Sequence, residues 1–297
     1  MSKNYEGIWS PMPTPLDTTG HIDVKRIPEL VEYLVEGGVD GLFPLGTSGE
    51  FAFLSRDERR TMVKHVVDAA NGRVPVAAGV SDTSIESVIQ YAKEAEDLGA
   101  DAVVTTTPYY FATGDKGIHN FIKAIVGRIN LPLILYNIPD YTRNPVSVQL
   151  LNELSEEHLI VGMKYTENNI SKLIQYLASC GKKISILNGT FALTYSCLSF
   201  GGAGSVISVA NIAPKKASSI YDDFRAGRLE RAAKTQLELM QIDQILSVGS
   251  FPAAMKYAMS LVGQPVGGTK PPIPDLSDSE KSIVRSMLEN YEKHEPQ

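Results

Sequence analysis

One lysine of this sequence lies where a charged side chain is costly. Lys164 falls within the apolar run IVGMKY (160–165), and such runs are typical of buried strands. An ammonium group buried without a partner costs several kcal/mol, or it loses its proton. Because a neutral amine attacks carbonyl groups, Lys164 indicates Schiff-base chemistry. The structural alternative is a buried ion pair with another strand, since Glu167, three residues along, would face the other way.

Two further patterns could supply the acid–base and binding groups of such a reaction. Tyr136 interrupts the preceding run, LPLILYNIP (131–139), and a phenol beside an amine can transfer protons. The alternative for this residue is an ordinary core tyrosine whose hydroxyl is satisfied. The turn GTSGE (46–50) has glycines around Thr47 and Ser48, which lets backbone amides converge on an anion such as a carboxylate. Its alternative is a tight turn between a strand and a helix.

These residues belong to a chain that alternates short apolar runs with amphipathic stretches. Most of the runs are rich in β-branched residues and are apolar at both odd and even positions, as expected for strands that are buried on both faces. Eight such runs occur, at residues 7–15, 41–45, 74–80, 101–107, 131–139, 160–165, 184–189 and 204–209. The stretches between them have helical periodicity, with capping signals such as Ser55 and Ser84 at their starts.

The repeated unit predicts an α/β fold with a closed barrel. Strand starts recur every ~20 to 35 residues, which is the length of a βα unit, and this alternation implies a parallel sheet. Eight units in about 220 residues predict a (β/α)8 TIM barrel. The rival is an open doubly wound sheet, but no glycine-rich nucleotide-binding turn follows the first strand. In the barrel, Tyr136 and the GTSGE turn would lie at the strands' carboxyl ends, where active sites of this fold form.

The last part of the chain is purely helical. Helical patterns follow residue 209 at 214–226, 229–247, 252–262 and 277–291, with a Pro/Gly-rich connection at 263–276. We therefore expect a barrel over residues 1–225 and a C-terminal helical extension over residues 226–297 that packs on it. No linker is long or polar enough to make the extension an independent domain.

Composition excludes several classes of protein. With 43% hydrophobic and 21% charged residues the chain is typical of globular proteins, and its net charge of -6 argues against nucleic-acid binding. No apolar run approaches the roughly 18 to 20 residues that span a bilayer, and the first residues lack the apolar core of a signal peptide. We expect a cytoplasmic protein without a membrane partner. The five histidines and two cysteines lack ligand spacing, so neither a metal nor another cofactor is expected.

Taken together, the pieces resemble the dihydrodipicolinate synthase / N-acetylneuraminate lyase family over residues 7–276. The resemblance is specific because its segments occur in the right order on the right predicted strands. These segments are TP (14–15), GTSGEFAFLS (46–55), TTTPYYF (105–111), LYNIP (135–139), GMKYT (162–166) and GSVISVAN (204–211). The resemblance implies class I aldolase chemistry on a 2-oxo acid, usually pyruvate.

The resemblance also implies a role for each matching residue. Lys164 would form the Schiff base, and Tyr136 would donate and accept protons at the substrate. Thr47 would connect Tyr136 in a proton relay to Tyr110, which in the family reaches into the site of a neighbouring subunit. The family is generally tetrameric, so a homotetramer built as a dimer of dimers is expected.

The remaining implied contacts are with the substrate carboxylate and the pyruvate pocket. Gly46 and Ser48, with the backbone around them, would hold the carboxylate, and Ile207 would line the pocket. Dihydrodipicolinate synthases carry an arginine two residues after the proline of LYNIP, where it binds the carboxylate of aspartate semialdehyde. This sequence has Tyr141 at that position, and Arg143 is the candidate substitute.

Sugar-acid lyases of the family differ at another position. They place acidic residues just after the glycine that matches Gly189, where they hold polyol hydroxyls. Here Thr190, Phe191 and Ala192 follow, which disfavours a long polyol such as sialic acid. Thr166 matches a threonine that sugar-acid aldolases place near the acceptor, so a 2-keto-3-deoxy sugar acid remains a candidate substrate.

Two classes of function follow from these patterns. The first is a Schiff-base lyase that joins or cleaves pyruvate and an aldehyde of its own. Within it, a 2-keto-3-deoxygluconate-type aldolase is the runner-up and a 4-hydroxy-tetrahydrodipicolinate synthase comes third. The second class is a ligand-binding barrel without catalysis. The set of Lys164, Tyr136, Thr47 and Tyr110 favours the enzyme, because a pure binder does not need a buried nucleophile.

Overall fold

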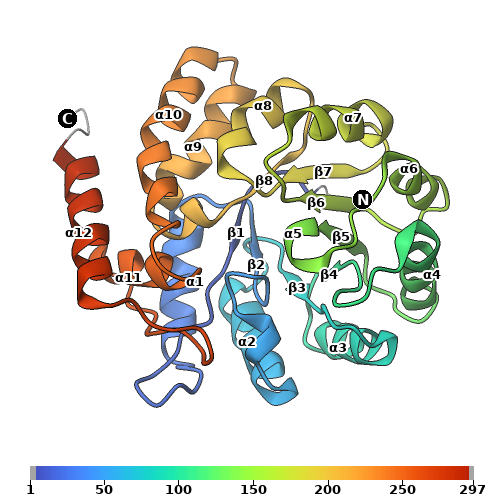
Figure 1. The fold of residues 1–297 in the computed structure, drawn as a ribbon, viewed down its shortest axis with the longest axis horizontal. Helices are drawn as coiled ribbons and strands as arrows, with labels where there is room; N and C mark the ends of the chain where they lie inside the picture. Colours follow the sequence, from blue (N-terminus) through green and yellow to red (C-terminus); the bar gives the residue numbers. More distant parts are fainter. Residues whose placement is uncertain (1–4, 294–297) are drawn as a thin grey trace.

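Parallel strands form the centre of the computed structural model, which describes residues 5–293 (Figure 1). Each strand lies within one of the apolar runs that predict it, and nearly all of its residues are buried, as expected for strands covered on both faces. The strands are β1 (Gly7–Pro11), β2 (Gly41–Phe43), β3 (Ala77–Gly79), β4 (Ala102–Thr106), β5 (Leu133–Asn137), β6 (Gly162–Tyr165), β7 (Ser185–Asn188) and β8 (Gly204–Val206).

The order of the strands confirms the (β/α)8 barrel. They are hydrogen-bonded in the order β2-β1-β8-β7-β6-β5-β4-β3, and every pair is parallel. A parallel bridge between Leu42 and Val76 connects the two ends of this order, so the barrel is nearly closed. The open doubly wound sheet, the rival interpretation of the sequence, is therefore wrong.

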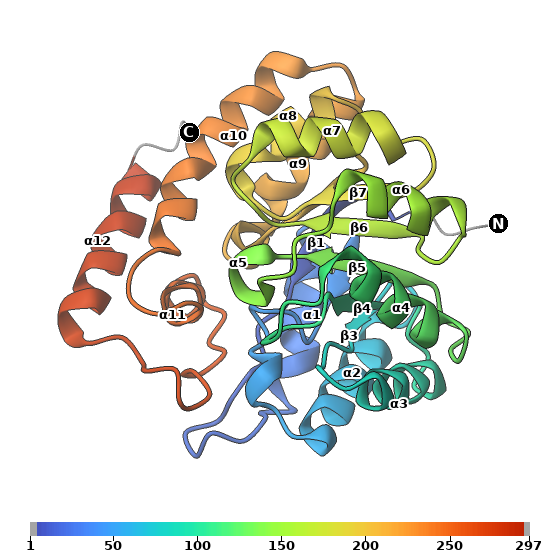
Figure 2. The same ribbon diagram turned by 45° about the vertical axis from the view of Figure 1, so that its right-hand side comes forward.

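Helices cover the outside of the barrel (Figure 2). Two of the expected N-caps are present: the Ser55 side chain accepts from the Glu58 backbone in a capping box, and Ser84 accepts from the Ser87 backbone. These helices are α1 (Arg26–Glu36), α2 (Arg56–Ala70), α3 (Ile85–Asp97), α4 (Gly114–Val126), α5 (Pro139–Thr142), α6 (Val148–Glu156), α7 (Ile170–Cys180), α8 (Thr194–Ser199) and α9 (Pro214–Arg225). No helix of residues 5–293 has the length and apolar content needed to cross a bilayer.

The C-terminal helices lie along one side of the barrel, beyond α1 and α9 (Figure 1). All of the helices expected there are present, as α10 (Leu229–Ile245), α11 (Ala253–Leu261) and α12 (Asp278–Lys293) following α9. Every residue of α11 from Ala253 to Met259 except Tyr257 is buried, so this short helix lies inside the structure and not on its surface.

The direction of the side chains along β5 and β6 follows from the register of the sheet. Along β5, Ile134 and Tyr136 belong to the cluster that fills the barrel, whereas Leu133 and Leu135 pack between the barrel and its helices. Lys164 is the direct partner of Tyr136 on the neighbouring strand. Because paired residues of adjacent strands share a face, the Lys164 side chain points into the barrel.

Candidate active site

Lys164 is buried inside the barrel without a carboxylate partner. Its exposed fraction is 5%, and within residues 5–293 no acidic side chain lies at ion-pair distance from its amine. The nitrogen instead lies 4.1 Å from the centre of the Tyr136 ring and 5.2 Å from that of Phe43. Glu167 accepts a hydrogen bond from the Tyr165 hydroxyl, so it is engaged elsewhere. The buried ion pair considered from the sequence is therefore absent from the described chain.

Tyr136 and Thr47 meet beside this amine. The Thr47 Oγ1 atom lies 3.5 Å from the Tyr136 hydroxyl, although the two residues are 89 positions apart. The Phe43 and Tyr136 rings pack edge to face, with an interplanar angle of 81°. The Tyr136 ring thus has the Lys164 amine over its face and the Thr47 hydroxyl beside its phenol oxygen, which places a proton donor and acceptor close to the amine.

The turn that carries Thr47 has a backbone that only certain residues can form. Leu45 and Glu50, at its two ends, have φ values of 61° and 57°, in the left-handed region. A side chain at Gly46 would come within 2.8 Å of the Phe43 ring, and one at Gly49 within 3.1 Å of the Met12 carbonyl oxygen. The turn therefore leaves little room for a side chain on either side of Thr47 and Ser48.

Ser48 and Ile207 are far apart in the sequence but lie in the same region of the structure. The Ser48 hydroxyl lies 3.2 Å from the hydroxyl of Ser208, which directly follows Ile207. Ile207 is fully buried after β8, and its backbone N–H donates to the Trp9 carbonyl. The sequence did not identify Ser208, whose only signal was its place directly after the last barrel strand.

Gly189 and Thr166 border the Lys164 side chain. A side chain at Gly189 would lie 1.9 Å from Thr166 Oγ1 and 2.9 Å from Lys164 Cε, so the missing side chain makes room for both residues. The Thr166 hydroxyl is buried and has no hydrogen-bond partner within the part of the chain that the structure describes. A buried hydroxyl without a partner next to an amine is suited to contact a bound ligand.

Tyr110 is far more exposed than the other predicted catalytic residues. Its exposed fraction is 81%, its φ of 79° is unusual for a tyrosine, and its ring packs edge-on against Phe111. The Asn144 side chain holds this loop, since its amide donates to the carbonyls of Pro108 and Phe111 and its oxygen accepts from the Thr113 backbone. Within the described chain, no hydrogen bond joins Tyr110 to the Thr47 and Tyr136 pair.

A cavity of about 320 Å³ lies beside Thr47, at the carboxyl ends of β2, β4 and β5. Tyr141 lines it, and burial together with the nearby Tyr136 raises the pKa of the Tyr141 phenol. Arg143 does not line this cavity: it is exposed and follows α5 with a left-handed φ of 55°. Phe251 and Ile273, from the C-terminal part of the chain, complete the wall.

Sequence reasoning missed a second buried lysine near this turn. Lys256, on α11, donates to Glu50 Oε1 at 2.8 Å and to the Thr14 carbonyl at 2.9 Å. Its exposed fraction is 1%, and burial lowers the pKa of its ammonium group while Glu50 opposes that shift. Both glutamate oxygens are engaged, because Oε2 accepts from the Lys270 backbone. The available signal was the segment AAMKYAM, in which apolar residues surround the lysine.

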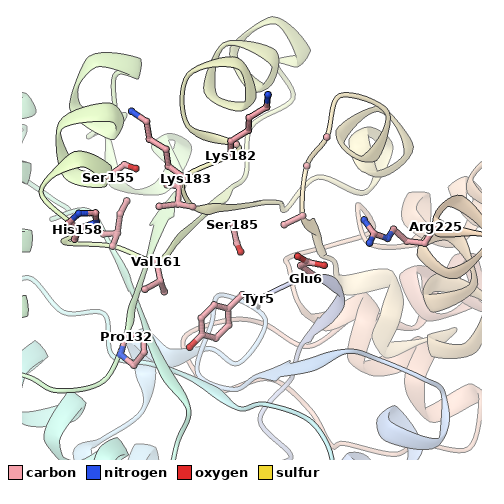
Figure 3. Close-up of a pocket in the computed structure, with 16 residues that line it drawn as sticks. Tyr5, Glu6, Pro132, Ser155, His158, Val161, Lys182, Lys183, Ser185 and Arg225 are labelled. Carbon is pink, nitrogen blue, oxygen red and sulfur yellow. The ribbon is translucent and has the colours of Figure 1, made fainter. Parts of the chain in front are cut away.

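Another cavity, of about 510 Å³, lies at the opposite end of the barrel (Figure 3). Its walls come from segments that precede β1, β5, β6, β7 and β8, and none of the predicted site residues lines it. Figure 3 shows the Lys182 and Lys183 side chains pointing away from its centre, and Lys183 bonds Asn152 and Glu156 on α6. Since active sites of this fold lie at the carboxyl ends of the strands, the smaller cavity is the candidate site. Thr47 and Tyr141 are the predicted site residues that line it, whereas Lys164 and Tyr136 do not. The contact between Thr47 and Tyr136 connects the cavity to the buried amine.

Comparison with known proteins gives a consistent result. The model of the dihydrodipicolinate synthetase family matches residues 4–291. A 4-hydroxy-tetrahydrodipicolinate synthase from Clostridium novyi is 34% identical over 274 residues, which cover 92% of this chain and 93% of the relative. A crystal structure of a dihydrodipicolinate synthase superimposes with a TM-score of 0.92 at 31% identity, covering 96% of this chain and 99% of that one. YagE from E. coli K12, of the same family and solved in complex with pyruvate, has a TM-score of 0.93 at 27% identity, covering 97% and 99%.

Proposed function

The chain belongs to the dihydrodipicolinate synthetase family, and on that premise we propose that it is a class I aldolase in which Lys164 forms a Schiff base with pyruvate. The enzyme joins pyruvate to an aldehyde or cleaves the product of that reaction. The observation that supports this function is the Lys164 amine, which is buried without a counter-ion and lies 4.1 Å from the centre of the Tyr136 ring.

The proposed reaction begins at the ketone carbon of pyruvate. The amine attacks this carbon, the ketone oxygen takes up protons and leaves as water, and an iminium links lysine and substrate. The iminium acidifies the methyl group, whose loss of a proton gives an enamine that attacks the aldehyde carbon. Tyr136 moves the protons, which its position between Lys164 and Thr47 supports.

The turn at residues 46–50 is the proposed site of the pyruvate carboxylate. Its backbone amides, with Gly46 and the Ser48 hydroxyl, would bind the anion, and its left-handed ends together with its two glycines support a fixed geometry. Ile207 would pack against the pyruvate methyl group. Gly189 leaves room for Lys164, and Thr166 would contact the aldehyde, as its unpartnered hydroxyl suggests.

Tyr110 is the proposed contribution of a second copy of the chain. Its exposure and the fixed loop that carries it suit a residue that completes a neighbour's proton relay. We therefore propose a homotetramer, arranged as a dimer of dimers, and a cytoplasmic location. Two free, buried cysteines, Cys180 and Cys197, suit a reducing compartment. Residues 226–297 would act as an extension of the barrel of residues 1–225, because Phe251 and Ile273 line the cavity beside Thr47.

The relatives named 4-hydroxy-tetrahydrodipicolinate synthase make that activity the second candidate. The residues around the acceptor argue against it. Tyr141 takes the place of the carboxylate-binding arginine, and Arg143 lies outside the cavity. An aldolase for a 2-keto-3-deoxy sugar acid keeps Thr166 in its favour.

Exchange of the pyruvate methyl protons tests the proposed function without knowledge of the aldehyde. Enamine formation in D2O replaces these protons by deuterium, which NMR detects directly. We expect the wild-type protein to catalyse the exchange and Lys164→Met to lose it. A folded wild-type protein that fails to exchange pyruvate, or a folded Lys164→Met protein that exchanges it normally, would contradict the proposal.

A further inference from the structure

The cavity beside Thr47 has a wall that is largely apolar and aromatic. The aromatic and aliphatic side chains come from four separate segments: the short helix after the GTSGE turn, the loops after β4 and β5, and the C-terminal part of the chain. The side chains that define this character are Phe51, Phe53, Tyr109, Ile138, Phe251 and Ile273. An apolar wall of this kind binds a ligand by removing its apolar surface from water.

The one negative charge among the described residues of this wall, the Glu50 carboxylate, is paired with the buried Lys256 amine. Among the described residues that line the cavity, Glu50 is the only one with a charged side chain. Its two oxygens accept hydrogen bonds from the Lys256 amine and the Lys270 backbone. No lysine or arginine of the described chain lines the cavity, so an aldehyde with a carboxylate would enter without a counter-ion.

The wall also offers few polar atoms. They are mainly hydroxyls, and Thr106 Oγ1 is buried there with no hydrogen-bond partner among residues 5–293. One oxygen atom on the ligand could satisfy that hydroxyl. An aldehyde with several hydroxyl groups would lose its bonds to water and find aromatic carbon around it.

The size of the cavity is sufficient for a ring. A protein cavity of about 150 Å³ holds benzene, and this one measures about 320 Å³. An aromatic ring with its aldehyde group therefore fits, and ring-to-ring contacts with Phe51, Phe53 or Phe251 can orient it.

We propose that the acceptor of this enzyme is an apolar aromatic aldehyde, an inference that rests on the function proposed above. Carbon 3 of the pyruvate enamine bonds to the aldehyde carbon, and the aldehyde oxygen takes up a proton. Water then hydrolyses the iminium and frees Lys164. The product is a 4-aryl-4-hydroxy-2-oxobutanoate, and the reverse reaction returns the aryl aldehyde and pyruvate.

A panel of three aldehydes tests the inference on the full chain. Benzaldehyde, D-glyceraldehyde and L-aspartate 4-semialdehyde are each incubated with pyruvate, and mass spectrometry follows the adducts. We expect kcat/KM for benzaldehyde to exceed the other two about a hundredfold. A larger value for either polar aldehyde, or no turnover of benzaldehyde, would overturn the inference.

Deuterium exchange into pyruvate, measured on the same preparation, separates the two proposals. If exchange proceeds but benzaldehyde is not used, only the acceptor class is wrong. If exchange is absent in the folded protein, the Schiff-base function fails and the acceptor inference fails with it.

Two substitutions locate the effect in the cavity. Phe251→Ala should lower kcat/KM for benzaldehyde about tenfold more than it lowers pyruvate exchange, whereas Phe200→Ala, an exposed phenylalanine after α8, should change neither. Tyr141→Arg places a cation on the wall and should shift preference at least tenfold toward the semialdehyde. If both cavity variants keep the wild-type preferences, this cavity does not receive the acceptor. If they fail to fold, the aldehyde panel on the wild-type protein decides.

Discussion

Two lysines of residues 5–293 are buried, Lys164 and Lys256, and they differ in what surrounds their amines. Lys256 is held between Glu50 and the Thr14 carbonyl, so its charge is neutralised and two of its three donors are used. Lys164 has two aromatic rings for neighbours and no carboxylate within the described chain. Lys256 connects a C-terminal helix to the turn at residues 46–50, whereas Lys164 has no such connection and is the proposed nucleophile.

The difference shows that burial alone does not identify a catalytic lysine. Both amines are almost inaccessible to water, and burial lowers the pKa of the Lys256 ammonium group. A paired ammonium is a poor nucleophile because it keeps its proton, and removing one member of a buried pair is costly. An amine without an ion-pair partner breaks no ion pair when it reacts. The absence of a carboxylate partner is therefore the property that distinguishes the two lysines.

The largest expected effect is a difference between the two lysines in how their substitution changes the free energy of unfolding. Lys256→Met leaves the Glu50 carboxylate buried without its cation, and we expect the free energy of unfolding to fall by about 3 to 5 kcal/mol. Lys164→Met removes an amine that has no ion-pair partner within the described chain, so its free energy of unfolding should stay the same or rise. Denaturant unfolding of both variants, followed by circular dichroism, measures the two values.

Equal effects of the two substitutions on stability would contradict the proposed difference between Lys164 and Lys256. A large loss for Lys164→Met would mean that this amine has a structural partner. No loss for Lys256→Met would mean that the Glu50 pair contributes little.

A double substitution tests whether the cost of Lys256→Met comes from the stranded carboxylate. Glu50→Gln removes the negative charge and keeps an acceptor for the Lys270 backbone. We therefore expect Glu50→Gln/Lys256→Met to be more stable than Lys256→Met alone by about 1 to 3 kcal/mol. A double variant no more stable than the single one would attribute the loss to packing around α11 and not to charge.

A half-buried carboxylate away from the site, Asp243, gives the smallest effect. Burial raises the pKa of Asp243, on α10, to about 6, and no hydrogen bond or ion pair of its carboxylate is present in residues 5–293. A raised carboxyl pKa means that the folded protein holds the proton more tightly than the unfolded chain. The contribution of this group to stability is therefore complete below pH 4 and is lost as the pH rises through 6.

Asp243→Asn should remove that pH dependence. Because the side chain keeps some contact with water, we expect a gain of roughly 1 kcal/mol at pH 7.5 that disappears near pH 4. Thermal unfolding at the two pH values measures it, with Asp278→Asn, an exposed residue at the start of α12, as the matched control. A gain that is equal at both pH values would show that the charge of Asp243 is not its cause.

The barrel could be predicted from the sequence because each strand is encoded by a short continuous segment. Each strand is a short apolar run, and every described strand falls inside one of the eight predicted runs. Lys164 was recognised for the same reason, since a lysine stands out in such a run. Lys256 was missed because a helix tolerates a lysine on any exposed face, and nothing local to α11 indicates that Glu50, 206 positions away, covers it.

The wall of the cavity could not be predicted for a related reason. Thr106, Tyr141, Phe251 and Ile273 come together only through the closure of the barrel and the return of the C-terminal part of the chain. Sequence comparison with the family placed Tyr141 opposite an arginine, which indicated an altered acceptor. It did not indicate the exposure of Arg143 or the aromatic character of the whole wall.

Borohydride reduction in the presence of pyruvate tests the central claim most directly, because it distinguishes the two buried lysines in one experiment. The reduced adduct is measured by the mass of the intact protein and then located by peptide mapping. We expect one pyruvyl adduct per chain, on Lys164, with Lys256 unmodified. A folded protein without an adduct, or with the adduct on Lys256, would contradict it.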